Sequence, residues 1–262
     1  MSNNLQSSSV VAKDTDDLMV VDALHLSYRE LNTRLKELVD QGVRTILLRG
    51  VLGQRYLGTN LRKKVRLIVE GVPGNDMGAF MDGPIIEVRG NAQDGCGNTM
   101  NSGTIIVHGS AGDIIGHSMR GGQVFVRDNV GYRVGIHMKE YGSVRPVIVI
   151  GGTAQHFLGE YMAGGILLIL GSQLEAEEYH PSRYVGTGMH GGVIYMRGKV
   201  DATFLGREVG IAPIEARDQL LVEQYVREYA RYFDVDAEEL LQRPFTKLAP
   251  LTNRPYGRLY AY

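Results

Sequence analysis

Apolar residues recur along the chain in short alternating runs, each introduced by a glycine and a methionine. Six methionines mark the units: the first four are 19 residues apart, and the next two gaps are 24 and 27 residues. They are Met81, Met100, Met119, Met138, Met162 and Met189. A glycine stands three residues before each of them, and five are followed shortly by another glycine. This repeated G-x-x-M phrase indicates a structural unit that stacks on copies of itself.

The run after each methionine has two sides. The fifth and seventh residues on are apolar, as in Ile105/Val107 and Val124/Val126, and alternation at period two puts such pairs on one face of a strand. In the fourth unit an insertion shifts the expected pair to Val147/Val149. These pairs are predicted to face a core.

A unit of 19 residues is too short for a strand, a crossover helix and their turns, but it suits one coil of a parallel β-helix. We therefore expect an all-β dominated fold: a right-handed parallel β-helix of about seven coils with capping helices at both ends. Glycines would form corners with positive φ, and methionines would fill irregular space inside them. The longer units predict loops at Tyr141–Arg145 and Gln173–Ser182.

The ends of the chain divide into four expected regions. Residues 1–16 are polar and predicted to be disordered. Residues 17–50 hold an N-terminal helix and cap, with a capping box at Ser27 and Glu30 and a stripe of Leu31, Leu35 and Leu38. Residues 51–210 form the β-helix. Residues 211–262 hold helices at 216–232 and 236–242 and an extended tail, with the longer helix anchored through Leu220, Leu221, Tyr225 and Phe233.

Composition excludes several classes of function. The formal net charge is −1 and no dense Lys/Arg run occurs, so we expect neither nucleic acid nor an anionic membrane as a partner. Cys96 is the single cysteine, which excludes a disulfide framework and an iron–sulfur cluster held by this chain's own thiolates. No apolar run is long enough to span a membrane and no stretch has signal-peptide character, so a cytoplasmic location is expected.

Candidate chemistry is sparse. Residues 186–191 match G-x-G-x-x-G, but the motif leads into a strand rather than a helix, which favours a corner over a dinucleotide site. Stacking would bring His117 and His137 within one coil of each other, and Asp94 lies at a corner nearby. A groove enzyme using these three residues is one alternative. Ordinary corner histidines, an aspartate that satisfies turn backbone and a small buried Cys96 are the simpler interpretation.

An apolar stripe on the outward face of the strands is harder to explain. Six residues after the methionines the column reads Ile106, Phe125 and Tyr195, with Ile148 and Leu168 assigned to the intervening coils. Such a stripe calls for coverage, either by this chain's own helices or by a partner subunit. The candidate partner interface comprises these five residues together with Phe245 and Tyr256 of the C-terminal tail.

The repeated glycines also carry a family resemblance. The segments GNDMGAFMDGP, GNAQDGCGNTMNSG, VGYRVGIHMKEYG and FLGEYMAGG resemble stand-alone members of the GXGXG domain family, over about residues 20–262. This family includes the C-terminal β-helix of the glutamate synthase large subunit. A similar β-helix occurs as the C-type subunit of formylmethanofuran dehydrogenase and of the related formyltransferase/hydrolase complex.

The resemblance implies a non-catalytic member of a glutamate synthase-like complex that makes glutamate or N-methylglutamate. Its expected partners are a glutaminase-type subunit and a synthase-type subunit that holds FMN and iron–sulfur clusters, with none of these cofactors in this chain. Because both catalytic portions are missing here, no catalytic, cofactor-binding or metal-binding residue carries over. The alternative is the β-helix subunit of a formylmethanofuran dehydrogenase or formyltransferase/hydrolase complex, and homo-oligomerisation stays open.

Overall fold

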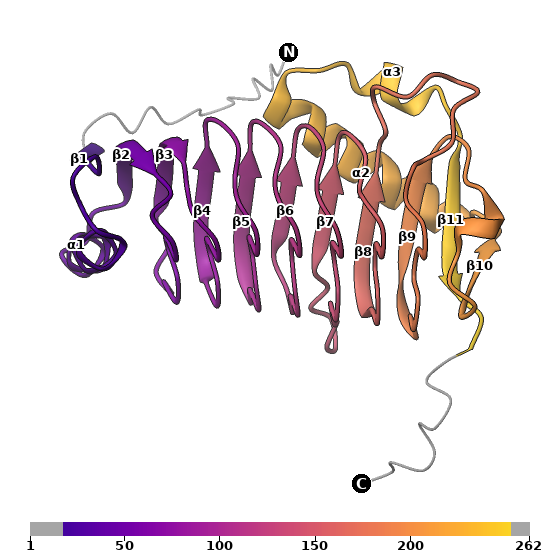
Figure 1. Ribbon diagram of the computed structural model, residues 1–262, viewed down its shortest axis with the longest axis horizontal. Helices are drawn as coiled ribbons and strands as arrows, with labels where there is room; N and C mark the ends of the chain where they lie inside the picture. Colours follow the sequence, from indigo (N-terminus) through magenta and orange to yellow (C-terminus); the bar gives the residue numbers. More distant parts are fainter. Residues whose placement is uncertain (1–17, 253–262) are drawn as a thin grey trace, which may run out of the picture.

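The computed structural model describes residues 18–252 as a parallel β-solenoid of about six turns, slightly fewer than expected, with few helices (Figure 1). One sheet runs along the rod in the order β1-β2-β3-β4-β5-β6-β7-β8-β9-β11-β10. Its strands are β1 (Leu18–Asp22), β2 (Thr45–Leu52), β3 (Arg66–Val72), β4 (Asp82–Val88), β5 (Ser102–Val107), β6 (Gln123–Val126), β7 (Val147–Ile150), β8 (Ala163–Ile169), β9 (Gly191–Arg197), β10 (Val209–Ala212) and β11 (Phe245–Pro250). The helices are α1 (Tyr28–Asp40), α2 (Ala216–Phe233), α3 (Ala237–Leu241) and the short 3-10 helix η1 (Ala202–Phe204).

Strands β1 to β9 pair in parallel, with a register shift within three of the pairs, and equivalent apolar residues stack along the rod. The inward column is the predicted one, with Ile105 beside Val124 and Leu167 beside Ile194. The fourth unit is the exception: Ile148 pairs with Val124 and faces the core, whereas Val147 and Val149 face outward. The sequence assignment was wrong there by one residue, and a slip of one residue exchanges the two faces of a strand.

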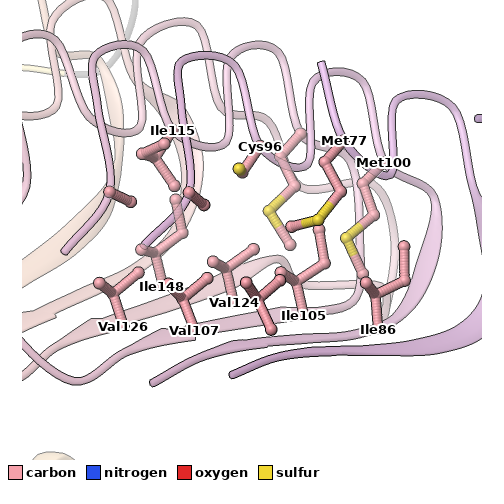
Figure 2. Packing of buried hydrophobic residues seen from close by; sticks show 14 of the residues in the cluster. Met77, Ile86, Cys96, Met100, Ile105, Val107, Ile115, Val124, Val126 and Ile148 are labelled. Carbon is pink, nitrogen blue, oxygen red and sulfur yellow. The ribbon is translucent and has the colours of Figure 1, made fainter. Parts of the chain in front are cut away.

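The wall opposite the sheet is built from the glycine corners. Here the residue four before each methionine points inward and packs against the strands, as Figure 2 shows for Met77, Cys96 and Ile115. The glycine three before the methionine has positive φ, as predicted. At Gly116 an added Cβ would lie 2.3 Å from Ile148 Cδ1, so a side chain there would force Ile148 to shift.

Non-glycine residues share the left-handed region at these corners, which was not predicted. The residue just before the methionine has positive φ at Phe80, Thr99, Ser118, His137 and Tyr161. Such backbone is strained for residues with a Cβ. The strain is tolerated because hydrogen bonds to neighbouring coils fix these residues, as between Phe80 N–H and the Asn98 carbonyl (2.9 Å).

Both ends follow the prediction in outline. The capping box of α1 is present, and Leu31, Leu35 and Leu38 are buried. Helix α2 matches the predicted range within one residue, but Leu220 is exposed and Val222, Val226 and Tyr229 are buried in its place.

The strands that close the rod were not predicted. Strand β1 pairs with β2, and the extended tail forms β11, which pairs antiparallel with β9 and β10. The predicted disorder of residues 1–16 and the last ten residues of the tail lie outside the described residues.

Candidate functional surfaces

The outward apolar stripe is covered by the chain's own helix α2. Ile106, Phe125, Leu168 and Tyr195 are all at most 4% exposed. They form a second core with the inner face of α2, whose members include Val222, Val226, Tyr229 and Phe233. The helix crosses the sheet from β9 back towards β5 (Figure 1), with the Phe125 and Tyr232 ring centroids 4.9 Å apart. Of the two kinds of coverage considered, the structure favours the internal one.

The two remaining described residues of the candidate interface lie in different environments. Ile148 is an inward core residue, and Val149 occupies the outward position instead. Phe245 is partly buried against the second core. Tyr256 lies outside the described residues. No open surface is therefore formed by the described members of this set.

A buried polar network fastens α2 to the sheet. Tyr195 donates its hydroxyl hydrogen to Asp218 Oδ1 (2.6 Å), and Lys247 Nζ lies 2.7 Å from Asp218 Oδ2. Asp218 also accepts from the Glu215 N–H (2.8 Å), which closes the first turn of α2. Burial alone would raise the pKa of Asp218, but the hydrogen bonds from Lys247 and Tyr195 outweigh it and lower that pKa. Burial, reinforced by Asp218, raises the pKa of the Tyr195 hydroxyl. The network links β9, α2 and β11, and its lowered pKa keeps Asp218 ionised at neutral pH.

Cys96 has the environment of a core residue. Its side chain is fully buried in the corner column, and burial, with smaller contributions from Asp76 and Asp94, raises the pKa of the thiol to about 12. A thiol of that pKa supplies almost no thiolate at neutral pH, so it is not poised to act as a nucleophile. The interpretation of Cys96 as a small buried corner residue is confirmed.

The residues of the groove-enzyme alternative do not form one constellation. His117 and His137 do lie on adjacent corners, with ring centroids 6.1 Å apart, and His137 stacks on Tyr161 at 5.4 Å. Partial burial, and then His137, lowers the pKa of His117. Asp94, however, accepts the Asp113 N–H (2.9 Å) and so satisfies turn backbone. Within residues 18–252 no group of three His, Cys, Asp or Glu is arranged to hold a metal ion.

The G-x-G-x-x-G segment is a corner, as predicted. Gly186 and Gly188 both have positive φ, and the segment continues into β9 rather than into a helix. It therefore lacks the helix N-terminus that binds a pyrophosphate in dinucleotide-binding folds.

One open groove at the N-terminal end of the rod was not predicted from the sequence. A groove of about 650 Å³ lies between α1 and the first corner of the rod, where Tyr28 and Leu35 of α1 face Tyr56, Gly58 and Thr59. It exists because α1 stands where a preceding coil would have its corner. The signal was present in the sequence: residues 54–61 carry the corner pattern with Leu61 in place of methionine, and a helix rather than another corner precedes them.

Comparison with known proteins identifies the family. The GXGXG motif family matches residues 27–251. The chain belongs to the GXGXG family. This GXGXG protein is 48% identical over 250 residues to the uncharacterized protein MJ1350 of Methanocaldococcus jannaschii, a match that covers 92% of this chain and 96% of that protein.

A solved structure shares the fold of this GXGXG protein. It is a chain in the crystal structure of the formyltransferase/hydrolase complex FhcABCD of Methylorubrum extorquens in complex with methylofuran. The TM-score is 0.61 at 19% identity, over 87% of this chain and 90% of that one. In the GXGXG protein, no helix within residues 18–252 is long and apolar enough to cross a membrane.

Proposed function

We propose that this chain is a non-catalytic structural subunit of a multi-subunit enzyme complex. The observation that carries the proposal is that its reactive groups are used inside the fold. Cys96 is buried with a raised thiol pKa, Asp94 holds turn backbone, and Tyr195, Asp218 and Lys247 fasten a helix. A catalytic group needs access to substrate and freedom to react, whereas the Cys96 thiol is buried and the other groups are held in hydrogen bonds within the fold.

Family kinship supports the same proposal. The fold neighbour is a chain of a complex with several subunits, and the GXGXG match extends over nearly the whole chain. A rigid rod whose faces present side chains at fixed spacing is suited to holding other subunits at defined distances.

Two complexes are candidates. The sequence resemblance favours a glutamate synthase-like complex, with a glutaminase-type partner and an FMN and iron–sulfur partner that forms glutamate or N-methylglutamate. The fold likeness gives better support to the alternative, the β-helix subunit of a formyl-transferring complex, because the neighbour is a chain of such a complex. The GXGXG match supports kinship with glutamate synthase only at the level of the domain.

An activity test separates scaffold from enzyme. The purified chain is assayed alone for glutamine hydrolysis and for formyl transfer, each with its product measured directly. The proposal expects no turnover in either assay. Turnover by the chain alone, lost on substitution of His117 or His137, would support the groove-enzyme alternative instead.

A further inference from the structure

Neighbouring corners of the rod are joined by a regular backbone ladder. Between the first two corners the bonds run in both directions: Tyr56 N–H to Asn75 C=O, Asn60 N–H to Ala79 C=O, Gly78 N–H to Leu57 C=O and Asp82 N–H to Leu61 C=O. Their lengths are 2.8 to 2.9 Å. The same pattern recurs at the next corner, where Gly97 donates to Met77 and Asn101 donates to Met81. Each corner therefore offers two donors and two acceptors to the corner before it.

At the first corner, most of the donors and acceptors that would pair with a preceding corner have no partner among residues 18–252. The amide of Asn32 on α1 reaches the Arg55 carbonyl (3.0 Å) and so replaces one donor of the missing corner. Within the described part of the chain, the N–H groups of Gly58 and Arg62 and the carbonyl of Thr59 have no hydrogen-bond partner. Gly58 is a buried residue, and an unpaired amide there is costly.

The opposite end of the rod is closed differently. The Val185 carbonyl accepts the Gly206 N–H (2.7 Å), and the Gly188 N–H donates to the Glu208 carboxylate (3.0 Å). Strand β11 then covers β9. The open ladder is thus specific to the N-terminal corner, where the groove described above has these unpaired groups in its wall.

The charged and apolar side chains that line the groove indicate which kind of ligand it would bind. The groove is lined by four cationic side chains, Arg29, Lys36, Arg62 and Lys63, and by a single carboxylate, Asp40. Asp40 is paired with Lys63 at 2.8 Å, which leaves a cationic excess around Lys36 and Arg62. Leu35, Val39 and Tyr56 supply apolar surface between the charges.

We propose that this groove binds an extended, acidic segment of a partner subunit, whose backbone adds the missing corner to the rod. The segment donates an N–H to the Thr59 carbonyl and offers carbonyls to the Gly58 and Arg62 amides. Its acidic side chains lie against Lys36 and Arg62. This mode of binding resembles the addition of a strand to a sheet edge, except that the segment adds to a corner. Main-chain hydrogen bonds give affinity and side chains give selectivity. The inference rests on the proposed scaffold function and assigns it a docking site.

The test uses a peptide with a corner sequence of this chain, PGNDMGAFMDG (residues 73–83), which carries two aspartates. In the folded chain these residues form the second corner and hydrogen-bond to the edge of the first corner that faces away from the groove. Full-length protein labelled with ¹⁵N is titrated with this peptide, and amide exchange is followed by NMR. We expect the Gly58 and Arg62 amides to exchange fast in the free chain and to become protected when the peptide binds. Gly78 and Gly97, whose amides are paired inside the rod, serve as internal references.

Two controls separate the ladder from charge alone. N-methylation of the peptide at its phenylalanine removes the N–H for Thr59, and we expect about tenfold weaker binding. The double variant Lys36→Glu/Arg62→Glu should weaken binding about tenfold or more at low ionic strength and by less at high salt. Lys139→Glu, at an exposed position on a distant corner, should leave binding unchanged.

Two results would overturn the inference. One is a Gly58 amide that is already protected in the free full-length chain, which would mean that the chain's own residues close the groove. The other is a folded protein that does not bind the peptide. Neither result affects the scaffold proposal, which depends on co-assembly and on the absence of turnover by the chain alone.

Discussion

Gly122 lies directly against the methyl end of Met100 from the preceding coil: a Cβ built on Gly122 would come within 2.4 Å of Met100 Cε. The relationship repeats along the rod, at Gly103 with Met81 (3.1 Å), Gly165 with Met138 (2.8 Å) and Gly192 with Met162 (2.5 Å). The methionine of one coil therefore occupies the space that a side chain on the next coil would need. This explains why glycine and methionine recur together in the sequence.

Gly122→Ala should destabilise the protein by about 1–3 kcal/mol through overpacking, with a further cost because φ is +79°. Gly142→Ala is the matched control, since Gly142 also has positive φ (+59°) but no atom of the described residues lies within 4 Å of its added Cβ. Urea denaturation measures both. Adding Met100→Ala should recover part of the Gly122→Ala cost in a double-mutant cycle, and strictly additive effects would contradict the packing explanation.

Phe125→Ala should lower stability by about 3–5 kcal/mol, because the side chain is fully buried between the sheet and α2. Amide exchange in α2 should accelerate more than exchange in α1. Leu220→Ala, at an exposed position of the same helix, should change stability by less than about 0.5 kcal/mol. A Phe125→Ala protein of unchanged stability that no longer assembles with partners would instead assign the stripe to an interface.

The buried pair of Asp218 and Lys247 should be costly to break. Asp218→Asn or Lys247→Met leaves one charge buried without its partner, and we expect a loss of about 3–5 kcal/mol for either. Arg34→Ala at the exposed Arg34–Glu37 pair is the control and should cost less than about 1 kcal/mol. Similar small losses for all three variants would show that the network is not what fastens α2.

His180 gives stability a pH dependence. It is buried, its Nε2 lies 2.8 Å from the Arg197 carbonyl, and its Nδ1 has no hydrogen-bond partner among residues 18–252. Burial lowers its pKa below the ordinary value of 6.5. The neutral form is favoured in the folded state, so this stability is fully present above pH 6.5 and is lost as the pH falls towards the lower folded-state pKa.

Chemical denaturation at pH 7 and pH 5 measures that effect. The loss on acidification should be smaller in His180→Gln than in the wild type, whereas His25→Gln, at an exposed position, should behave like the wild type. An identical pH dependence in all three proteins would contradict the assignment to His180.

The sequence predicted the rod because its main determinants are local and periodic. The inward pairs follow from alternation after each methionine, and the corners follow from the recurring glycines with positive φ. Prediction failed where an insertion changed the count: the loop around Tyr141 moves Ile148 from the outer face to the inner one. The burial of Cys96 was predictable, because apolar residues stand four before the methionines at Met77, Ile115 and Val134 as well.

The open end of the ladder could not be predicted in this way. It depends on where α1 stands relative to the first corner and on Asn32 reaching across 23 residues to Arg55. Likewise, the coverage of Phe125 by α2 is a contact between distant segments, and the sequence alone left it undecided between a helix and a partner.

The central claim, that this chain is a structural subunit of a larger enzyme, is tested most directly by isolating it at native abundance from its own cells with a C-terminal tag and determining the mass and composition of the particle. The account predicts a defined complex with stoichiometric catalytic subunits. A glutaminase-type and a flavin/iron–sulfur subunit would select the glutamate synthase-like complex, and formyltransferase/hydrolase-type subunits would select the other. A particle that contains only this chain and turns over either substrate would contradict the account.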